Sequence, residues 1–187
     1  MISSVTSLQS DLIQSAMDHE GIPGVAVAIV KSGEIIASEG YGYRNLNQQL
    51  PMTPHTVTPI CSLTKSITGT AIMQLVEQGK LSLDEPVRTY LPNLIISDAE
   101  TTGKITPRVL LNHKSGMGRT GHQPPMWTKT ISPYRDRSDL VSRLASIQMQ
   151  TAPNTAWSYC NEGFVTLGLL IETVSNTPLE EYFETQI

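Results

Sequence analysis

Hydrophobic positions along the first sixty residues predict one helix followed by a β-hairpin. Leu8–Glu20 carries apolar side chains at helical spacing, and a Gly-Ile-Pro-Gly sequence ends that pattern. Val25–Val30 is a short apolar run rich in strand-forming residues, and Ile35–Ser38 is a second one. The turn residues Lys31–Glu34 lie between them, so the two runs are expected to pair. Gly40–Pro59 is rich in Gly, Asn, Pro and Thr and is expected to be mostly loop.

The rest of the chain is dominated by helical patterns. Gly79 is expected to cap the C-terminus of one helix, while Thr106 and Pro107 take the N-cap and first helical positions of another. Lys114–Pro133 is expected to be a long loop, a length typical of functional or disordered segments, and Pro153–Tyr159 to be extended or turn. The expected helices are Ser62–Gln78, Leu83–Leu91, Thr106–Asn112, Asp136–Met149, Asn161–Ser175 and Pro178–Gln186.

The hairpin near the start of the chain has no predicted neighbour. A two-stranded hairpin is barely stable by itself, and the pattern predicts no strand after it. We therefore expect part of the sheet to be missing from this chain. Open strand edges also favour pairing with other chains, so we expect self-association or the docking of a complementing C-terminal segment.

Length and charge narrow the classes of protein that fit. At 187 residues the chain is long enough for one domain or slightly more. Its net charge of −4 comes from interspersed acids and bases without a basic stripe, which argues against a nucleic-acid partner. The longest apolar runs, Val25–Val30 and Leu167–Ile171, are far too short to span a bilayer. No signal peptide is visible at the first residues, so a cytoplasmic location is expected.

Two cysteines, Cys61 and Cys160, carry no metal-binding pattern. They do not form a Cys-x-x-Cys pair, and the four histidines are scattered, so no metal or other cofactor is expected. Two reduced, buried thiols are the favoured interpretation. A disulfide between them stays open, because it would need Cα atoms within about 7 Å of each other.

Ser62-Leu63-Thr64-Lys65 is the first candidate for chemistry. On a helix, a serine and a lysine three residues apart project from one face, one turn from each other. Ser62 would then lie at the helix N-terminus, where unpaired N–H groups favour the negative charge of an alkoxide or an oxyanion. A lysine can serve as the base for such a nucleophile without histidine. The alternative is that Ser62 only caps the helix and Lys65 is a solvated surface residue.

Tyr159-Cys160-Asn161 is the second candidate. A phenol relays a proton well when an ammonium group is nearby, and an asparagine can both donate to a substrate carbonyl and accept from a lysine. The alternative is a tyrosine at the edge of the core, followed by an asparagine that caps the next helix. Tyr43-Arg44-Asn45 has the same pattern, which shows how little the pattern alone discriminates.

Longer stretches of sequence frame these two candidates. They are Ile22–Val30, Gly40–Arg44, Ser62–Ser66, Leu75–Val87, Ile105–Met117 and Trp157–Phe164. In these residues and in their order the chain resembles the serine β-lactamase and penicillin-binding-protein superfamily. The resemblance is to the branch that holds class C β-lactamases, D-stereospecific peptidases and related esterases. It implies an α/β fold of the α+β type, the β-lactamase/DD-peptidase-like fold, with an N-terminal helix and β-hairpin plus a helical subdomain.

The resemblance also implies roles for individual residues. Ser62 would be the acylated nucleophile, and its backbone N–H would form half of the oxyanion hole. Lys65 would take or hold the proton of Ser62, with Tyr159 as the second member of the base system. Asn161 would orient both the substrate and Lys65. The implied activity is that of a serine hydrolase acting on a small-molecule or peptide-like ester, amide or β-lactam.

Three further residues attract attention and receive lesser roles. His113 has the chemistry of a base, but the resemblance implies a structural position. Glu162 is expected in the first turn of a helix, where its charge complements the helix dipole. Trp127, in the long loop, is a candidate for lining the pocket.

One element of the superfamily is not matched. Its third motif, Lys-Thr-Gly or His-x-Gly, lies on a strand near the C-terminus and supplies the second oxyanion donor. Lys31–Gly33, Lys114–Gly116 and His19–Gly21 contain similar residues in other places. We therefore expect residues 1–187 to form an incomplete serine hydrolase domain without the C-terminal strands of the sheet. Within it, 1–60 would supply the helix and hairpin and 61–187 the two motifs. The alternative is a truncated, non-catalytic domain that serves as a binding module or as part of a split enzyme.

Overall fold

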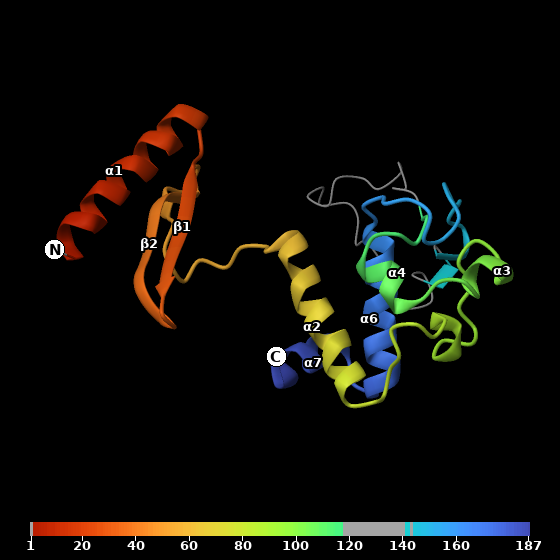
Figure 1. Ribbon diagram of the computed structural model, residues 1–187. Helices are drawn as coiled ribbons and strands as arrows, with labels where there is room; N and C mark the ends of the chain where they lie inside the picture. Colours follow the sequence, from red (N-terminus) through yellow and green to blue (C-terminus); the bar gives the residue numbers. More distant parts are fainter. Residues whose placement is uncertain (1, 118–140, 143) are drawn as a thin grey trace. The chain divides into compact units, whose positions relative to one another are not determined.

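The computed structural model describes residues 2–117, 141–142 and 144–187 (Figure 1). The chain divides into two compact units, Met1–Pro59 and Ile60–Ile187. Each unit has its own secondary structure and is described by itself.

The first unit combines one helix with a small antiparallel sheet. Its elements are α1 (Ile2–Glu20), β1 (Gly24–Lys31), β2 (Glu34–Asn45) and β3 (Leu50–Pro51), and the strand order is β1-β2-β3. Ser32 and Gly33, both with positive φ, form the tight turn between β1 and β2. Met17 is buried, and Ser10 shares a hydrogen bond of 3.1 Å with the phenol of Tyr41, so α1 packs against β2. The predicted helix and hairpin are confirmed.

The sheet is larger than the sequence pattern predicted. The expectation that Gly40–Pro59 is mostly loop is wrong for its first half, because β2 continues to Asn45 and β3 then pairs with it. The expectation that no strand follows the hairpin is wrong for the same reason. A Cβ on Gly40 would lie 2.4 Å from the carbonyl oxygen of Met52, and one on Gly42 2.3 Å from that of Pro23. These glycines therefore permit close backbone approach within the unit rather than breaking the strand.

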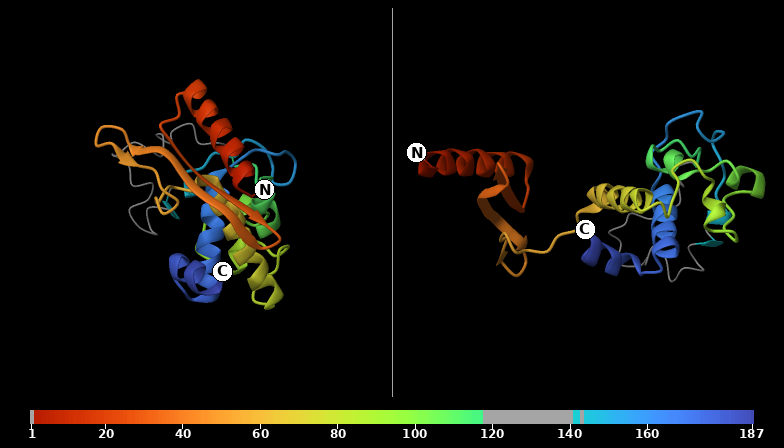
Figure 2. Two further views of the ribbon diagram at one scale, coloured as in Figure 1. Left: turned by 90° about the vertical axis from the view of Figure 1, so that its left-hand side faces the viewer. Right: turned by 60° about the horizontal axis from the view of Figure 1, so that its bottom comes forward.

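The second unit is mainly helical and contains nearly all of the buried core. Its elements are η1 (Cys61–Leu63), α2 (Thr64–Glu77), η2 (Val87–Thr89), α3 (Ala99–Thr102), α4 (Pro107–Leu111), α6 (Asn161–Ser175) and α7 (Leu179–Gln186). Figure 2 shows α2 in yellow, with α6 and α7 in blue. Fully buried side chains from α2, α4 and α6 meet in one cluster that includes Ile72, Leu75, Leu110, Leu167 and Leu170. Burying each such side chain contributes about 1.5–3 kcal/mol.

Several helix boundaries follow the signals in the sequence. Beyond the C-terminus of α2, Gly79 has a φ of +67° and its N–H donates to the carbonyl of Val76, while the N–H of Lys80 donates to that of Leu75. This pair of bonds is a Schellman motif with the glycine at its left-handed position. Thr106 caps α4 through its side chain, with Pro107 at the first helical position. The predicted helices Asn161–Ser175 and Pro178–Gln186 are also confirmed.

Other predictions differ from the structure. Leu83–Leu91 contains only the single turn η2, because Pro86 in an extended conformation precedes it. The helix expected to reach Met149 ends earlier, since Met149 forms an isolated β-bridge with Met117. Most of the loop around Trp127, and residues 136–140 at the start of that helix, lie outside the described residues.

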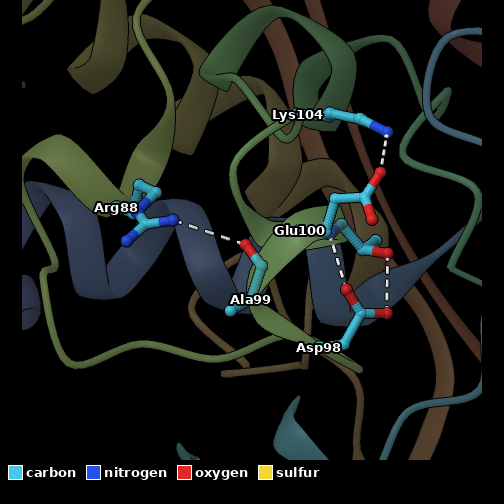
Figure 3. Close-up of polar contacts among 6 residues, drawn as sticks. Arg88, Asp98, Ala99, Glu100 and Lys104 are labelled. Carbon is cyan, nitrogen blue, oxygen red and sulfur yellow. Dashed lines mark hydrogen bonds and ion pairs between the residues drawn. The ribbon is translucent and has the colours of Figure 1, made fainter.

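The short helix α3 was not predicted, and polar contacts hold it in place (Figure 3). The carboxylate of Asp98 caps it by accepting from the backbone N–H and the hydroxyl of Thr101, at 2.7 and 2.8 Å. The bond from the backbone N–H has the larger effect, and together the two bonds lower the pKa of Asp98 below its usual range. Lys104 forms an ion pair with Glu100 at 2.7 Å. A helix of one turn has too few apolar positions to produce a periodic signal.

None of the helices in the described ranges is long and apolar enough to cross a membrane.

Candidate active site

The packing of α2 against α6 places the beginnings of these two helices together. The inward positions of α2 are Thr68, Ala71, Ile72 and Leu75, which follow helical spacing, and α6 buries a longer apolar series that includes Leu167, Leu170 and Ile171. The two helices are direct neighbours in the core of the second unit (Figure 1). Side chains from the first turn of each helix therefore meet at one end of the pair.

Four polar side chains converge at that end. The hydroxyl oxygen of Ser62 lies 2.6 Å from the phenol oxygen of Tyr159 and 3.3 Å from Nζ of Lys65. Lys65 also donates to the side-chain oxygen of Asn161 at 2.8 Å. All four residues that the sequence singled out are thus joined in one hydrogen-bonded chain. Both polar residues of the Tyr-x-Asn pattern take part, because Tyr159 contacts Ser62 and Asn161 contacts Lys65.

Neither Ser62 nor Asn161 caps a helix with its side chain. Leu63 is the N-cap of α2, with no side-chain capping bond. Cys160 occupies that position for α6, again without such a bond, and Asn161 is the first helical residue. The capping alternatives for both residues are therefore wrong, because the Ser62 hydroxyl contacts Tyr159 and Lys65, and the Asn161 side chain accepts from Lys65.

The backbone next to Ser62 is unusual. Cys61 has a φ of +48°, a left-handed backbone conformation that residues other than glycine rarely adopt. It opens the 3₁₀ turn Cys61–Leu63, which leads directly into α2. Such conformations cost about 1–3 kcal/mol and cluster at functional sites. The exposed Ser62 is presented by this strained turn.

The two cysteines are both free and differ in burial. Cys61 is exposed, so the expectation of a buried thiol there is wrong, while Cys160 is buried as expected. The thiol of Cys160 donates to a carboxylate oxygen of Glu162 at 3.2 Å. Burial first, and then the negative charge of Glu162, raises the pKa of Cys160 to about 12. Glu162 lies in the first turn of α6, as predicted.

Aromatic side chains surround Lys65 and Tyr159. The Lys65 amine lies 4.8 Å from the centre of the Tyr159 ring and 5.5 Å from that of Phe164. The ring of His113 lies 4.6 Å from that of Tyr159 and 5.1 Å from that of Phe164. Burial, followed by the positive charge of Lys65, lowers the pKa of His113. Sequence reasoning missed Phe164, since an apolar residue in a helix carries no chemical signal.

The other candidate motifs lie elsewhere. Tyr43 and Asn45 belong to strand β2 of the first unit, and Lys31–Gly33 is the turn of its hairpin. In Lys114–Gly116, Ser115 is buried and its hydroxyl accepts from the N–H of Met117 at 3.3 Å. The described residues hold no group of three or more His, Cys, Asp or Glu side chains that could bind a metal.

Known proteins share this fold. The octameric penicillin-binding protein homologue from Pyrococcus abyssi is 32% identical, with a TM-score of 0.81 over 98% of this chain and 42% of its own. EstCE1, a hydrolase with promiscuous acyltransferase activity, is 25% identical, with a TM-score of 0.82 over 100% of this chain and 51% of its own. A class C β-lactamase in complex with cefoxitin is 26% identical, with a TM-score of 0.80 over 100% and 49%.

The same relationship holds at the level of sequence. Protein flp of Staphylococcus aureus is 27% identical over 174 residues, which cover 91% of this chain and 34% of flp. The chain thus spans about a third of this curated relative and about half of the solved structures. The fold is that of the β-lactamases and penicillin-binding proteins. The Beta-lactamase family model matches residues 10–187, a range that contains both motifs of the site, and the chain therefore belongs to the Beta-lactamase family.

Proposed function

We propose that this chain carries the nucleophile and the base system of a serine hydrolase that forms an acyl-enzyme on Ser62. The observation that carries the proposal is the position of the Ser62 hydroxyl, 2.6 Å from the Tyr159 phenol oxygen and 3.3 Å from the Lys65 amine, which donates to it. A nucleophile within hydrogen-bond reach of a base, which is itself oriented by a third group, is the arrangement that activates a hydroxyl. Asn161 is that third group for Lys65.

The reaction follows from this arrangement. Ser62 Oγ attacks the carbonyl carbon of the substrate, and its proton passes to the deprotonated member of the Tyr159–Lys65 pair. The tetrahedral intermediate then expels an alcohol or amine, which takes up that proton, and the acyl group remains on Ser62 as an ester. Water attacks this ester, releases the carboxylic acid and restores the serine. In this proposal the N–H of Ser62, near the N-terminus of α2, stabilises the oxyanion.

The substrate class is an ester, an amide or a β-lactam. All three present a carbonyl carbon to the same nucleophile and differ only in the group that leaves. The relatives support this range, because they include a class C β-lactamase in complex with cefoxitin and a hydrolase with acyltransferase activity. We propose a small-molecule or peptide-like substrate, which can reach Ser62 because that residue is exposed to solvent.

The alternative is a non-catalytic domain that serves as a binding module or as part of a split enzyme. Such a domain would keep the fold and bind an acyl compound without forming a covalent bond to it.

Covalent labelling separates these two functions. The chain is incubated with a fluorescent penicillin and, separately, with a fluorophosphonate, and the labelled residue is located by mass spectrometry. We expect a label on Ser62, and none on that site in Ser62→Ala. Ser66→Ala is the matched control, because Ser66 is an exposed serine four residues further along the same segment. Labelling that survives in Ser62→Ala, or none in the folded wild-type chain with either probe, would contradict the proposal.

A further inference from the structure

His113 makes hydrogen bonds on both sides of Tyr159. Its carbonyl oxygen accepts from the N–H of Ser158 at 2.9 Å, and its ring nitrogen Nδ1 accepts from the N–H of Cys160 at 3.2 Å. Tyr159 is the residue between these two donors. One histidine, 47 residues away from Cys160 in sequence, thus fixes the backbone that carries the phenol.

The imidazole ring also packs against the Tyr159 side chain. The two rings lie 4.6 Å apart with a tilt of 33°. Trp157 meets the imidazole edge-on at 6.1 Å, and Phe164 lies 5.1 Å away. The imidazole is therefore close to three aromatic rings, two from the segment that leads into α6 and one from α6 itself.

The end of α4 determines where His113 lies. The N–H of His113 donates to the carbonyl of Leu110, and the N–H of Lys114 donates to that of Val109. This is a Schellman motif in which His113, with a φ of +56°, takes the left-handed position that glycine usually fills. Histidine and asparagine adopt this conformation more readily than most residues. The helix end thus directs both the carbonyl and the ring of His113 toward the Ser158–Cys160 backbone.

We propose that neutral His113 is a positioning residue that holds the Tyr159 phenol against Ser62, and that protonation of its ring releases this hold. The proposal rests on the proposed function, in which Tyr159 belongs to the base system. In the neutral ring that accepts at Nδ1, the proton is on Nε2. Once Nδ1 is protonated it becomes a donor and faces the donor N–H of Cys160, so this bond is lost.

The surrounding charges favour the neutral ring. Burial and the positive charge of Lys65 both lower the pKa of His113 below its ordinary value of about 6.5. Among the described residues, the other titratable groups nearby are Tyr159 and Cys160, which approach from the segment before α6, and Glu162, which accepts from the thiol of Cys160. The pKa of Cys160 is about 12. The Cys160 thiol therefore stays neutral in the mildly acidic range in which the His113 ring becomes protonated.

Two substitutions separate the acceptor from the ring. His113→Asn places an amide oxygen near the position of Nδ1, tolerates the left-handed backbone and does not titrate. His113→Phe keeps an aromatic ring and removes the acceptor. We expect the Cys160 amide to exchange its hydrogen about tenfold faster in His113→Phe than in wild type, and at a nearly unchanged rate in His113→Asn. This measurement does not depend on activity.

The pH profile of Ser62 acylation is the second measurement. Wild type is expected to lose labelling rate as the pH falls below about 6.5 and His113 becomes protonated, while His113→Asn stays flat over that range. At about pH 7.5, His113→Phe is expected to label about tenfold or more slowly, and His113→Asn clearly faster than His113→Phe. A purely structural histidine would not move the acid limb of the profile, and a limb produced by any other group would persist in His113→Asn.

The possible results distinguish the two proposals. Equal exchange of the Cys160 amide in both variants, or an acid limb that persists in His113→Asn, would overturn the role of His113 and leave the proposed function intact. If wild type fails to label at Ser62 at any pH, the proposed function fails. In that case the exchange rates still decide whether the His113 ring holds the backbone on either side of Tyr159.

Discussion

The side-chain oxygen of Asn161 accepts a hydrogen bond of 2.8 Å from Nζ of Lys65, which joins the first turn of α6 to the first turn of α2. The same lysine lies 3.3 Å from the hydroxyl of Ser62, and Tyr159 completes the group from the residue before Cys160. Each helix, together with the residues just before it, therefore contributes one half of a single polar network. The buried interface between the helices fixes the distance between the halves.

Removing the phenol oxygen of Tyr159 tests the base system. Tyr159→Phe keeps the ring contacts with His113 and Lys65 but deletes the partner of Ser62 at 2.6 Å. If Tyr159 accepts the proton of Ser62, the rate of covalent labelling falls about 10²–10⁴-fold. The free energy of unfolding changes by only about 1 kcal/mol, because one partly exposed hydrogen bond is lost.

The second Tyr-x-Asn sequence, Tyr43-Arg44-Asn45, provides the control for Tyr159. Tyr43→Phe makes the same chemical change in strand β2, within the other Tyr-x-Asn sequence. It is expected to leave the labelling rate as in wild type. A fall of similar size in both variants would indicate a general effect of losing a phenol rather than a role for Tyr159.

Asn161→Ala tests the orientation of Lys65. The substitution removes the oxygen that accepts from Nζ, so the amine is no longer held between Asn161 and Ser62. The labelling rate is expected to fall about tenfold or more, measured by stopped-time quantification of the fluorescent adduct. Asn45→Ala is the matched change, since Asn45 accepts from the N–H of Gln48 in a turn of the first unit. Unchanged labelling in Asn161→Ala would remove this residue from the site.

Much of the fold was predictable because its signals are local. The apolar periodicity of Asn161–Ser175 and the Thr-Pro start of α4 lie within single segments, and both predictions are confirmed. The extent of β2 was not predictable, because Gly40 and Gly42 have the composition of a loop. These two positions require glycine because the backbones of Met52 and Pro23 approach them closely, and that approach appears only in the folded structure.

The candidate site likewise combines contacts that local spacing predicts with contacts that it does not. Ser62 and Lys65 are one helical turn apart, so their proximity followed from spacing alone. Tyr159 is 97 residues away from Ser62, so its proximity to Ser62 could be predicted only from the resemblance to a family. The bonds of His113 to the residues on either side of Tyr159 depend on how α4 ends, and no periodic pattern encodes that contact.

Two glycines of the second unit are expected to respond oppositely to alanine. Gly79 has a φ of +67°, and no atom lies within 4 Å of the position that an alanine Cβ would take there. Gly79→Ala therefore carries only backbone strain and is expected to destabilise by about 1 kcal/mol. Gly69 lies inside α2, where an alanine Cβ would have Leu111 as its nearest neighbour, at 3.9 Å. Gly69→Ala is expected to stabilise by about 0.5–1 kcal/mol.

Urea unfolding followed by circular dichroism measures both glycine variants. The midpoints are expected to move in opposite directions with the same dependence on urea concentration. Destabilisation by Gly69→Ala would mean that its methyl group does not fit against Leu111. An unchanged midpoint for Gly79→Ala would contradict the left-handed conformation that ends α2.

The two thiols are expected to differ strongly in reactivity. Cys61 is exposed, whereas Cys160 is buried and its pKa is about 12. A thiol becomes reactive only as the thiolate, so at about pH 8 roughly one in ten thousand Cys160 side chains is in the reactive form. Iodoacetamide should therefore modify Cys61 in the folded chain and Cys160 only after unfolding in guanidinium, as read by peptide mass spectrometry. Cys61→Ser should abolish the fast reaction and leave the slow one. Rapid modification of Cys160 in the folded Cys61→Ser chain would contradict the burial of this thiol, because a buried thiol with so small a thiolate fraction reacts slowly.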